Sequence, residues 1–260
     1  MRAALLVLAA LAFATFAPTG AAPAVATTHF HQGPCEEQFV AIPIPMVEAA
    51  ALTPPGFPPQ PFDAAGMLPP NPALATGVTV GYRCAATEGD GISLGEVRTV
   101  GRALLVDPPA ELRAPGIHNY VIIFGGWTSS PELARVYTSW HLPAVRVGQV
   151  DFIVAQDSPN LRHGRVTGAS AEGSLELTTV AAGVDDAQQP DVFRLFGFDQ
   201  GRLAGYVDWS WPAGARTIES GAALQVLQAP GALPDARAGV SFHYYGAYAY
   251  DLAFTDLSGR

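Results

Sequence analysis

The feature that most constrains this chain is a succession of short strand-like segments, which begins near Thr76 and continues almost to the C-terminal end. These segments are rich in β-branched and aromatic residues, and several alternate apolar with polar positions. Glycine-containing turns of hairpin type separate some of them, as at Ala171-Glu172-Gly173 and Asp199-Gln200-Gly201. Strands at this density predict a mainly β (α+β) fold with a large antiparallel sheet, curled or closed into a barrel. The predicted strands are residues 38–44, 78–82, 92–106, 118–127, 145–155, 164–170, 174–182, 192–198, 203–211, 222–227 and 240–254.

One main helix is expected to pack on this sheet, over residues 129–140. Ser130 suits the N-cap, Pro131 suits the first helical position, and Glu132 favours the positive end of the helix dipole. Apolar residues at helical spacing predict the buried stripe Leu133, Val136, Tyr137 and Trp140. Residues 45–52 are expected to form a second, shorter helix.

Two segments are expected to be irregular. Residues 53–72 hold eight prolines, which excludes a helix or an interior strand. Phe57 and Phe62 lie in this segment, so it is expected to pack against the body of the protein rather than to be a free linker. Gly125 and Gly126 precede the main helix, where an anion can bind, but a plain strand-to-helix turn is the interpretation we favour.

The N-terminal residues 1–26 have the composition of a secretory signal peptide. Residues 3–17 form an apolar run that is shorter than the about 20 residues needed to span a bilayer. Ala24-Val25-Ala26 offers small residues at a cleavage site, and an N-terminal anchor is the alternative. No later stretch is long and apolar enough to cross a membrane. We therefore expect a secreted, periplasmic or extracellular protein, with residues 27–260 as a single β-rich domain.

The two cysteines, Cys35 and Cys84, both follow the expected cleavage site. An even number of cysteines in an exported protein predicts a disulfide, which would tie the N-terminal segment to the body. Two free buried thiols are the alternative.

The charge balance restricts the chemistry that the chain can perform. The net charge is −9, so no nucleic-acid partner is expected, because phosphate binding needs clustered basic residues. All 14 basic residues are arginines, and the absence of lysine excludes an enzyme mechanism through a lysine Schiff base. The sequence predicts no cofactor.

A metal site is conceivable only at the N-terminus that cleavage would create. The mature chain would begin Thr27-Thr28-His29, and a free amine, two amides and the His29 imidazole form a square-planar set of nitrogens for Cu(II) or Ni(II). The alternative is an unstructured terminus with a chance histidine.

Two motifs resemble acetoacetate decarboxylase-like proteins. Residues 40–57 resemble the opening of that family, in which a strand leads to a short helix ending in Leu-Pro-Pro-Gly-Phe. Here Leu52-Thr53-Pro54-Pro55-Gly56-Phe57 carries one inserted residue. Trp140-His141-Leu142-Pro143-Ala144 is similar to the family's Trp-Gly-Phe-Pro-Lys, and a β-rich half follows. The resemblance covers most of residues 38–254 and implies a curved, cone-like antiparallel barrel that encloses a pocket.

The departures from the family pattern matter for activity. The family's Schiff-base lysine falls on Ala144, and its Arg-Glu pair falls on Tyr137 and Thr138. The resemblance therefore implies the fold and a pocket, and these departures argue against the family's decarboxylation.

The resemblance also implies a ligand-binding set in this stretch: Trp140, His141, Pro143, Ala144 and Arg146. Strand alternation places Ala144 and Arg146 on one face, so that an apolar wall with one guanidinium would hold a carboxylate or carbonyl group. The alternative is that Arg146 points to solvent and Ala144 belongs to the core.

Three functions follow from these observations. The first is an exported barrel that binds a small apolar, carboxylate-bearing or carbonyl-bearing molecule, without Schiff-base decarboxylase activity. The second is a lyase or hydrolase that uses the same pocket with Arg146, His141 and a nearby acid. The third is an envelope structural protein with no small ligand. A cavity with convergent polar groups would favour the first two, and a filled barrel would favour the third.

Overall fold

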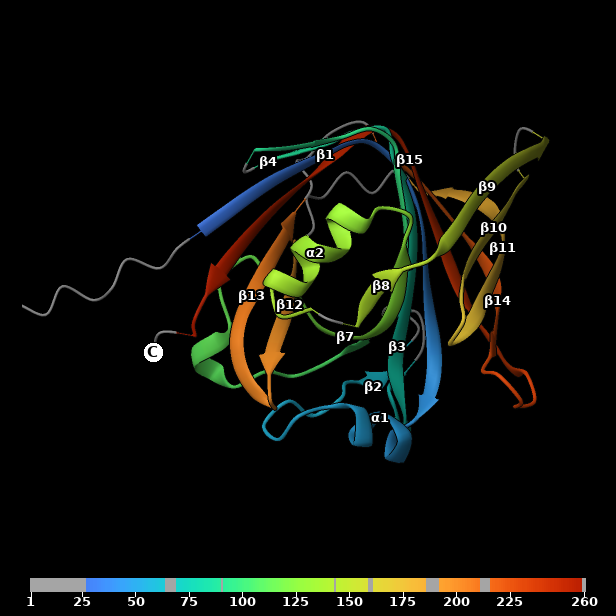
Figure 1. The fold of residues 1–260 in the computed structure, drawn as a ribbon. Helices are drawn as coiled ribbons and strands as arrows, with labels where there is room; N and C mark the ends of the chain where they lie inside the picture. Colours follow the sequence, from blue (N-terminus) through green and yellow to red (C-terminus); the bar gives the residue numbers. More distant parts are fainter. Residues whose placement is uncertain are drawn as a thin grey trace, which may run out of the picture.

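The computed structural model describes residues 27–63, 69–89, 91–142, 144–158, 161–185, 192–210 and 216–258. Seven strands in this part of the chain close into a barrel, in the order β1, β3, β6, β7, β12, β13 and β15, which returns to β1 (Figure 1). Their bounds are β1 Thr27–Pro45, β3 Asn71–Cys84, β6 Val97–Leu105, β7 Asn119–Thr128, β12 Val192–Asp199, β13 Arg202–Ser210 and β15 Asp235–Asp256. The predicted mainly β barrel with few helices is therefore confirmed.

The barrel closes because β1 and β15 are long enough to pair along most of their length. Their register begins at Thr27↔Thr255 and ends at Ala41↔Val240. The sequence predicted a strand only over residues 38–44, and the pairing with β15 extends it to Thr27–Pro45. The barrel is not wholly antiparallel, because β7 pairs with β12 in parallel after a long connection.

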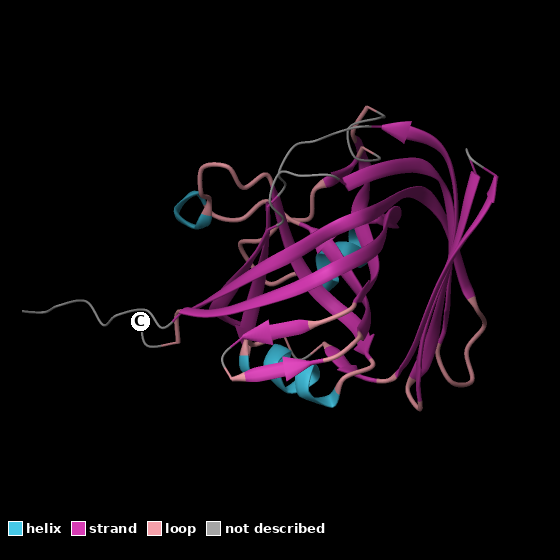
Figure 2. Cartoon of the chain, turned by 90° about the horizontal axis from the view of Figure 1, so that it is seen from above, coloured by secondary structure: helices cyan, strands magenta, loops and turns pink. Residues whose placement is uncertain are grey.

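A second group of strands extends the sheet beyond the barrel. From β15 the sheet continues through β14 (Arg216–Gln228), β11 (Gly173–Asp185), β10 (Leu161–Ser170) and β9 (Gln149–Ser158), which we call the outer sheet. This outer sheet curves over the barrel wall, so that β9 and β10 contact β6 (Figure 2). Smaller strands complete the sheet: β2 Pro61–Phe62, β4 Thr87–Gly89, β5 Ile92–Leu94 and β8 Val145–Val147.

The space between the barrel wall and the outer sheet, which we call the outer compartment, is filled by side chains. Its apolar residues are Val40, Ile42, Val100, Val150, Phe152, Val166, Leu175, Leu177 and Ala223. The two layers approach closely at glycines: a Cβ built on Gly81 of β3 would lie 2.7 Å from a methyl carbon of Val166 on β10. The apolar runs of the wall strands therefore have a partner on their outer side as well as inside the barrel.

The main helix, α2 (Pro131–Ser139), forms as the capping pattern predicted. The Ser130 hydroxyl accepts a hydrogen bond from the Leu133 amide at 3.1 Å, and Pro131 occupies the first turn. Leu133, Val136 and Tyr137 are buried against the barrel. Gly125 and Gly126 lie inside β7 rather than in the turn that the sequence favoured, because β7 runs on to Thr128.

The first helix and the proline-rich segment cover another part of the barrel. Helix α1 (Met46–Leu52) follows β1, and a short 3-10 helix, η1 (Ala110–Leu112), lies between β6 and β7. Phe57 is buried edge-on to Phe196 and Phe198, so the described part of the proline-rich segment packs against the body as expected. None of the helices in the described residues is long and apolar enough to cross a membrane.

The predicted disulfide is confirmed. Cys35 of β1 and Cys84 of β3 stand directly opposite each other in the β1–β3 register and are joined. Both are buried, and the bond links residues 49 positions apart. It therefore connects the N-terminal strand to the barrel wall.

Candidate functional site

The barrel encloses a cavity of about 70 Å³. Since a single water molecule needs about 10–15 Å³ on a comparable measure, the cavity holds several waters or a small organic molecule. Most of its wall is apolar and comes from β3, β6, β7 and β12. The apolar lining residues of these strands include Val78, Val80, Ala103, Val121, Ile123, Phe193 and Leu195.

A carboxyl group lies in this apolar wall. Glu37 of β1 lines the cavity and is only 6% exposed. Its carboxylate accepts a hydrogen bond from the Tyr250 hydroxyl of β15, and Tyr250 is fully buried. Because burying a carboxyl group is costly unless it is hydrogen-bonded, this contact stabilises Glu37 in the cavity wall.

Two further tyrosines bring hydroxyl groups to the same cavity. Tyr82 of β3 and Tyr137 of α2 are hydrogen-bonded to each other through their phenol oxygens. Burial raises the pKa of the Tyr82 hydroxyl, and burial together with the neighbouring Tyr82 raises the pKa of the Tyr137 hydroxyl well above its ordinary value. Both phenols therefore remain neutral at physiological pH.

A tryptophan of β13 supplies a hydrogen-bond donor that no described residue uses. Trp209 lines the cavity and packs edge-on to Tyr82 and Tyr250, with ring centres 5.3 and 5.0 Å away. Its indole Nε1 is buried, and within the described part of the chain it has no hydrogen-bond partner. A buried N–H without a partner is unusual, because the unmade bond costs free energy.

A glycine leaves one position of the cavity wall without a side chain. Gly101 of β6 lines the cavity between Thr99 and Ala103, and a Cβ built on it has no heavy atom within 4 Å. The wall therefore has room for a side chain that the sequence does not supply.

The charges of the lining residues restrict the chemistry of a ligand. No arginine or histidine is among the described residues that line the cavity, whereas Glu37 is acidic. A negatively charged ligand would therefore meet no opposite charge in this wall. The arrangement suits an uncharged molecule that accepts a hydrogen bond from an N–H or O–H group and is otherwise apolar.

The residues that the resemblance implied lie mostly outside this cavity. Trp140 is buried between Phe30 and Phe254, and it borders a separate depression of about 340 Å³ on the barrel. His141 packs near Phe254, with its backbone in the left-handed region at φ 58°. Pro143 lies outside the described residues.

Strand alternation explains the position of the remaining two. Val145 lines the cavity, and so its neighbours Ala144 and Arg146 are directed elsewhere. The Arg146 side chain is 57% exposed and pairs with Glu172, which matches the solvent-facing alternative. Whether any residue of this set contacts a ligand stays a prediction.

The N-terminal residues lie in the ladder between β1 and β15. Thr27, Thr28 and His29 stand opposite Thr255, Phe254 and Ala253. A metal ion held by the backbone nitrogens of residues 27–29 would have to release them from this ladder, so the His29 metal site stays a prediction. In the described residues, no group of three or more His, Cys, Asp or Glu side chains is placed to hold a metal ion.

Glu37 and Trp209 did not stand out in the sequence as site residues. One signal for Glu37 was present, because strand alternation puts it on the same face as Phe39, which also lines the cavity. No comparable signal existed for Trp209, since only the closed barrel brings β13 opposite β3 and β1.

Comparison with known proteins finds solved structures with a similar fold. No family model matches the sequence, and no curated protein matches it. The enduracididine biosynthesis enzyme MppR with HEPES buffer bound matches at a TM-score of 0.56 and 11% identity, over 88% of this chain and 86% of that chain. MppR complexed with the condensation product of pyruvate and imidazole 4-carboxaldehyde has the same TM-score and identity, over 88% of this chain and 87% of that chain.

A solved acetoacetate decarboxylase also matches, at a TM-score of 0.48 and 12% identity, over 87% of each chain. The two MppR matches confirm the resemblance in fold to acetoacetate decarboxylase-like proteins, because MppR shares that fold. At these identities the likeness concerns the fold alone.

Proposed function

We propose that the barrel is a binding protein for a small, uncharged, largely apolar molecule that carries one carbonyl group. The observation that carries this proposal is the unpartnered indole N–H of Trp209, whose side chain lines a mostly apolar cavity. A carbonyl oxygen would accept that hydrogen bond, and the apolar remainder would lie against the valine-rich wall.

The polar groups of the cavity support an uncharged ligand rather than an anion. Glu37 and the phenols of Tyr82 and Tyr137 are hydrogen-bonded within the protein, and none of them carries a positive charge. The sequence resemblance led us to expect a ligand that is apolar or bears a carboxylate or carbonyl group. The cavity favours the carbonyl form of that expectation. MppR is complexed with the condensation product of pyruvate and imidazole 4-carboxaldehyde, two small carbonyl compounds, so a neighbour with this fold accommodates a product of such compounds.

Binding in this proposal does not proceed through an imine. A Schiff base needs a primary amine next to the carbonyl carbon, and the chain contains no lysine. Borohydride reduction in the presence of acetoacetate should therefore leave no covalent adduct on residues 38–254, and an adduct there would overturn this part of the proposal.

Export from the cell is a further part of the proposal. The Cys35–Cys84 disulfide supports it, because structural disulfides are typical of oxidising compartments. The absence of a membrane-spanning helix among the described residues is compatible with it.

The experiment that tests ligand binding follows the Trp209 indole N–H by NMR. Acetone, cyclopentanone and 2-heptanone are titrated into the protein, and at least one should shift the Trp209 signal saturably. Gly101→Leu fills the open wall position and should abolish the shift while the protein remains folded. Gly95→Leu is the matched control, because Gly95 is exposed and its built Cβ also has no neighbour within 4 Å.

Two results would overturn the proposal. One is a Trp209 signal that none of the three ketones shifts. The other is a shift that persists in Gly101→Leu, because the ketone would then bind outside the cavity.

A further inference from the structure

A partly buried arginine lies on the opposite side of the barrel wall from the cavity. Arg102 of β6 stands directly opposite Thr79 of β3 on one side and Gly125 of β7 on the other. Directly opposed residues of antiparallel strands share a face, and Thr79 faces the outer compartment, where its hydroxyl is hydrogen-bonded to Gln225. Arg102 therefore belongs to the outer face, near the rim of the outer compartment.

The Arg102 guanidinium has no carboxylate of its own. Its central carbon lies 4.6 Å from the ring centre of Phe124, and the described residues offer it no hydrogen-bond or ion-pair partner. Burial, and then the charge of Arg237, lower the pKa of Arg102 to about 10. The carboxylates of Asp235 and Glu48 act in the opposite direction, and the group is still charged at neutral pH.

Arg194 shows how the same protein holds a buried arginine that has a structural role. Its guanidinium lies 3.9 Å from the ring centre of Tyr206 and makes two hydrogen bonds to the Asp208 carboxylate, at 2.7 and 2.8 Å. It also donates to the Leu112 carbonyl at 2.9 Å. Arg102 has the aromatic contact without the carboxylate, so the missing partner is a carboxylate-like group.

A second arginine, Arg237, lies close enough for its charge to act on Arg102. Arg237 of β15 donates through Nη2 to both oxygens of Glu48 on α1, at 3.0 Å, and through Nε to Asp235 at 3.0 Å. Its Nη1 is buried and has no partner among the described residues. Arg237 stands opposite Gln225 of β14, and Gln225 is bonded to Thr79, which is the cross-strand neighbour of Arg102.

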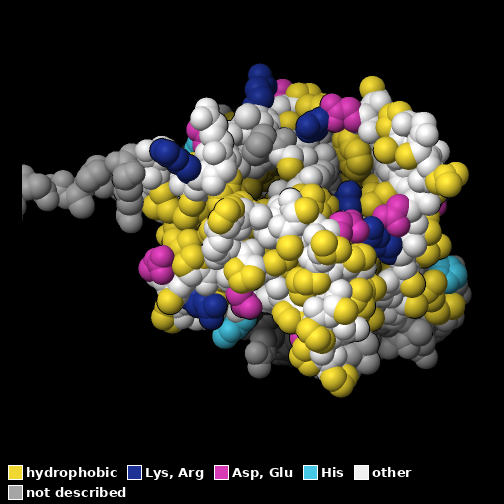
Figure 3. Space-filling view, turned by 90° about the horizontal axis from the view of Figure 1, so that it is seen from below, with side chains coloured by type: hydrophobic (Ala, Val, Ile, Leu, Met, Phe, Trp, Pro, Cys, Tyr) yellow, Lys and Arg dark blue, Asp and Glu magenta, His cyan; other side chains and the backbone are white. Residues whose placement is uncertain are grey.

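The two arginines and two carboxylates of this cluster balance in charge, but both carboxylates pair directly with Arg237. Arg237 is flanked by the carboxylates of Glu48 and Asp235, whereas Arg102 is unpaired. Beside Arg102, a Cβ built on Gly125 has no heavy atom within 4 Å, so there is open space on this flank. Seen from below, this end of the molecule has a hollow with hydrophobic walls and a group of acidic and basic side chains at its edge (Figure 3).

We propose that Arg102 binds the carboxylate of a small organic acid whose apolar part lies against Phe124 and the open flank beside Gly125. A guanidinium matches a carboxylate in a planar, two-point contact. A carboxylate brings less negative charge beside Glu48 and Asp235 than a phosphate dianion would. The site is separate from the barrel cavity, because the β6 wall lies between them.

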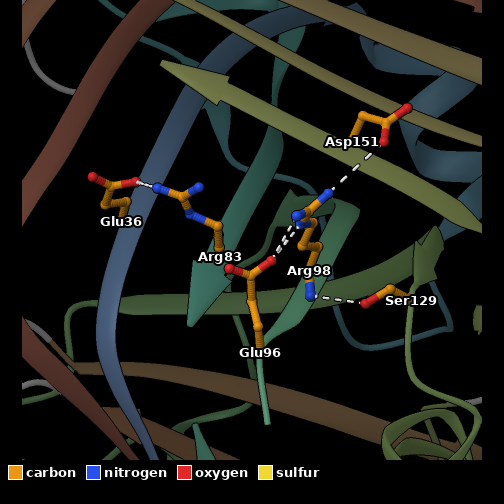
Figure 4. Close-up of polar contacts among 6 residues, drawn as sticks. All are labelled: Glu36, Arg83, Glu96, Arg98, Ser129 and Asp151. Carbon is orange, nitrogen blue, oxygen red and sulfur yellow. Dashed lines mark hydrogen bonds and ion pairs between the residues drawn. The ribbon is translucent and has the colours of Figure 1, made fainter. Parts of the chain in front are cut away.

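Calorimetric titration with sodium octanoate tests the proposal. The wild-type protein should bind octanoate, and Arg102→Met should weaken binding by about 10- to 100-fold, as expected for the loss of a charged hydrogen-bonded contact. Arg98→Met is the matched control on the same strand, because Arg98 is already paired with Glu96 and Asp151 (Figure 4). It should bind octanoate as the wild type does.

Two further variants separate binding beside Arg102 from binding in the barrel cavity. Gly125→Leu keeps the charge of Arg102 but fills the space beside it, and should also abolish octanoate binding. Gly101→Leu fills the barrel cavity and should leave octanoate binding unchanged, so failure of one site is distinguishable from failure of the other.

The stability of Arg102→Met supplies a second measurement. Replacing an unpaired, partly buried charge by methionine should leave the melting temperature unchanged or raise it. A clear fall would identify the guanidinium as a structural group and overturn the proposal. Absence of octanoate binding to the wild type at millimolar concentration, or equal Arg102-dependent binding of inorganic phosphate, would overturn it as well.

Discussion

The wall formed by β1, β3 and β6 has two sides that differ in how completely they are filled. Gly81 and Gly101 illustrate this, because they lie on neighbouring strands and face opposite sides of the wall. A Cβ on Gly81 would collide with Val166 of the outer sheet, whereas a Cβ on Gly101 would enter open space. The same residue type therefore permits close packing on one side and leaves a cavity on the other.

The two sides also differ in how their polar groups are satisfied. On the outer side, Gln38 is fully buried, accepts a hydrogen bond from Thr179 at 3.1 Å and donates to the Ile153 carbonyl at 3.3 Å. On the inner side, the Trp209 indole N–H has no partner among the described residues. Away from its rim at Arg102, packing with satisfied hydrogen bonds identifies the outer compartment as structural, whereas open space lined by a residue with an unused donor marks the inner cavity as the candidate site for an uncharged ligand.

The largest effect on stability is expected from removal of the disulfide. It joins β1 to β3, and these strands form the wall that the barrel cavity and the outer compartment share. Replacing Cys35 and Cys84 together by alanine should lower the free energy of unfolding by about 4 kcal/mol, the chain-entropy value for a loop of this length. Urea unfolding should show a single transition by near-UV circular dichroism and by tryptophan fluorescence. The barrel and the outer sheet should unfold together, since both depend on the wall formed by β1 and β3.

Two separate transitions in that variant would contradict the shared-wall interpretation. They would mean that the outer sheet unfolds independently of the barrel. The wild type under the same non-reducing conditions is the control.

A smaller effect is expected from Gly81→Ala, which tests the tightness of the outer side. Both methyl carbons and the Cβ of Val166 lie within 3.1 Å of the added atom, so no rotamer change relieves the contact and β10 must move. The free energy of unfolding should fall by about 1–3 kcal/mol, as for other overpacked cores. Urea denaturation measures this change. An unchanged midpoint would show that the outer compartment has room for an added methyl group.

Local sequence signals were sufficient for much of the fold. The capped helix at Pro131–Ser139, most of the strands and the Cys35–Cys84 bond all follow from neighbouring residues or from simple pairing arguments. The length of β1 was underestimated, because its first residues become a strand only through pairing with β15, more than 200 positions away. Long-range pairing of this kind leaves no local pattern.

The candidate site was harder to predict for the same reason. The motif that resembles the decarboxylase family directed attention to Ala144 and Arg146, but the structure turns Val145 inward instead. A shift of one residue along a strand reverses which side chains face the cavity. Glu37, Tyr82 and Trp209 come from three strands that meet only when the barrel closes, so their proximity could not be read from spacing along the chain.

The smallest effect, and the one of opposite sign, is expected from Gly101→Ala on the inner side. A glycine within a strand costs about 0.5–1 kcal/mol, mainly because the unfolded chain loses more conformational freedom on folding. The added methyl group at Gly101 meets no heavy atom within 4 Å, so nothing in the folded state offsets this gain. Gly101→Ala should therefore raise the free energy of unfolding by about 0.5–1 kcal/mol in urea denaturation, while Gly81→Ala lowers it. A loss of stability in both variants would show that the inner side is as tightly packed as the outer one, and the barrel would then have no cavity for a ligand.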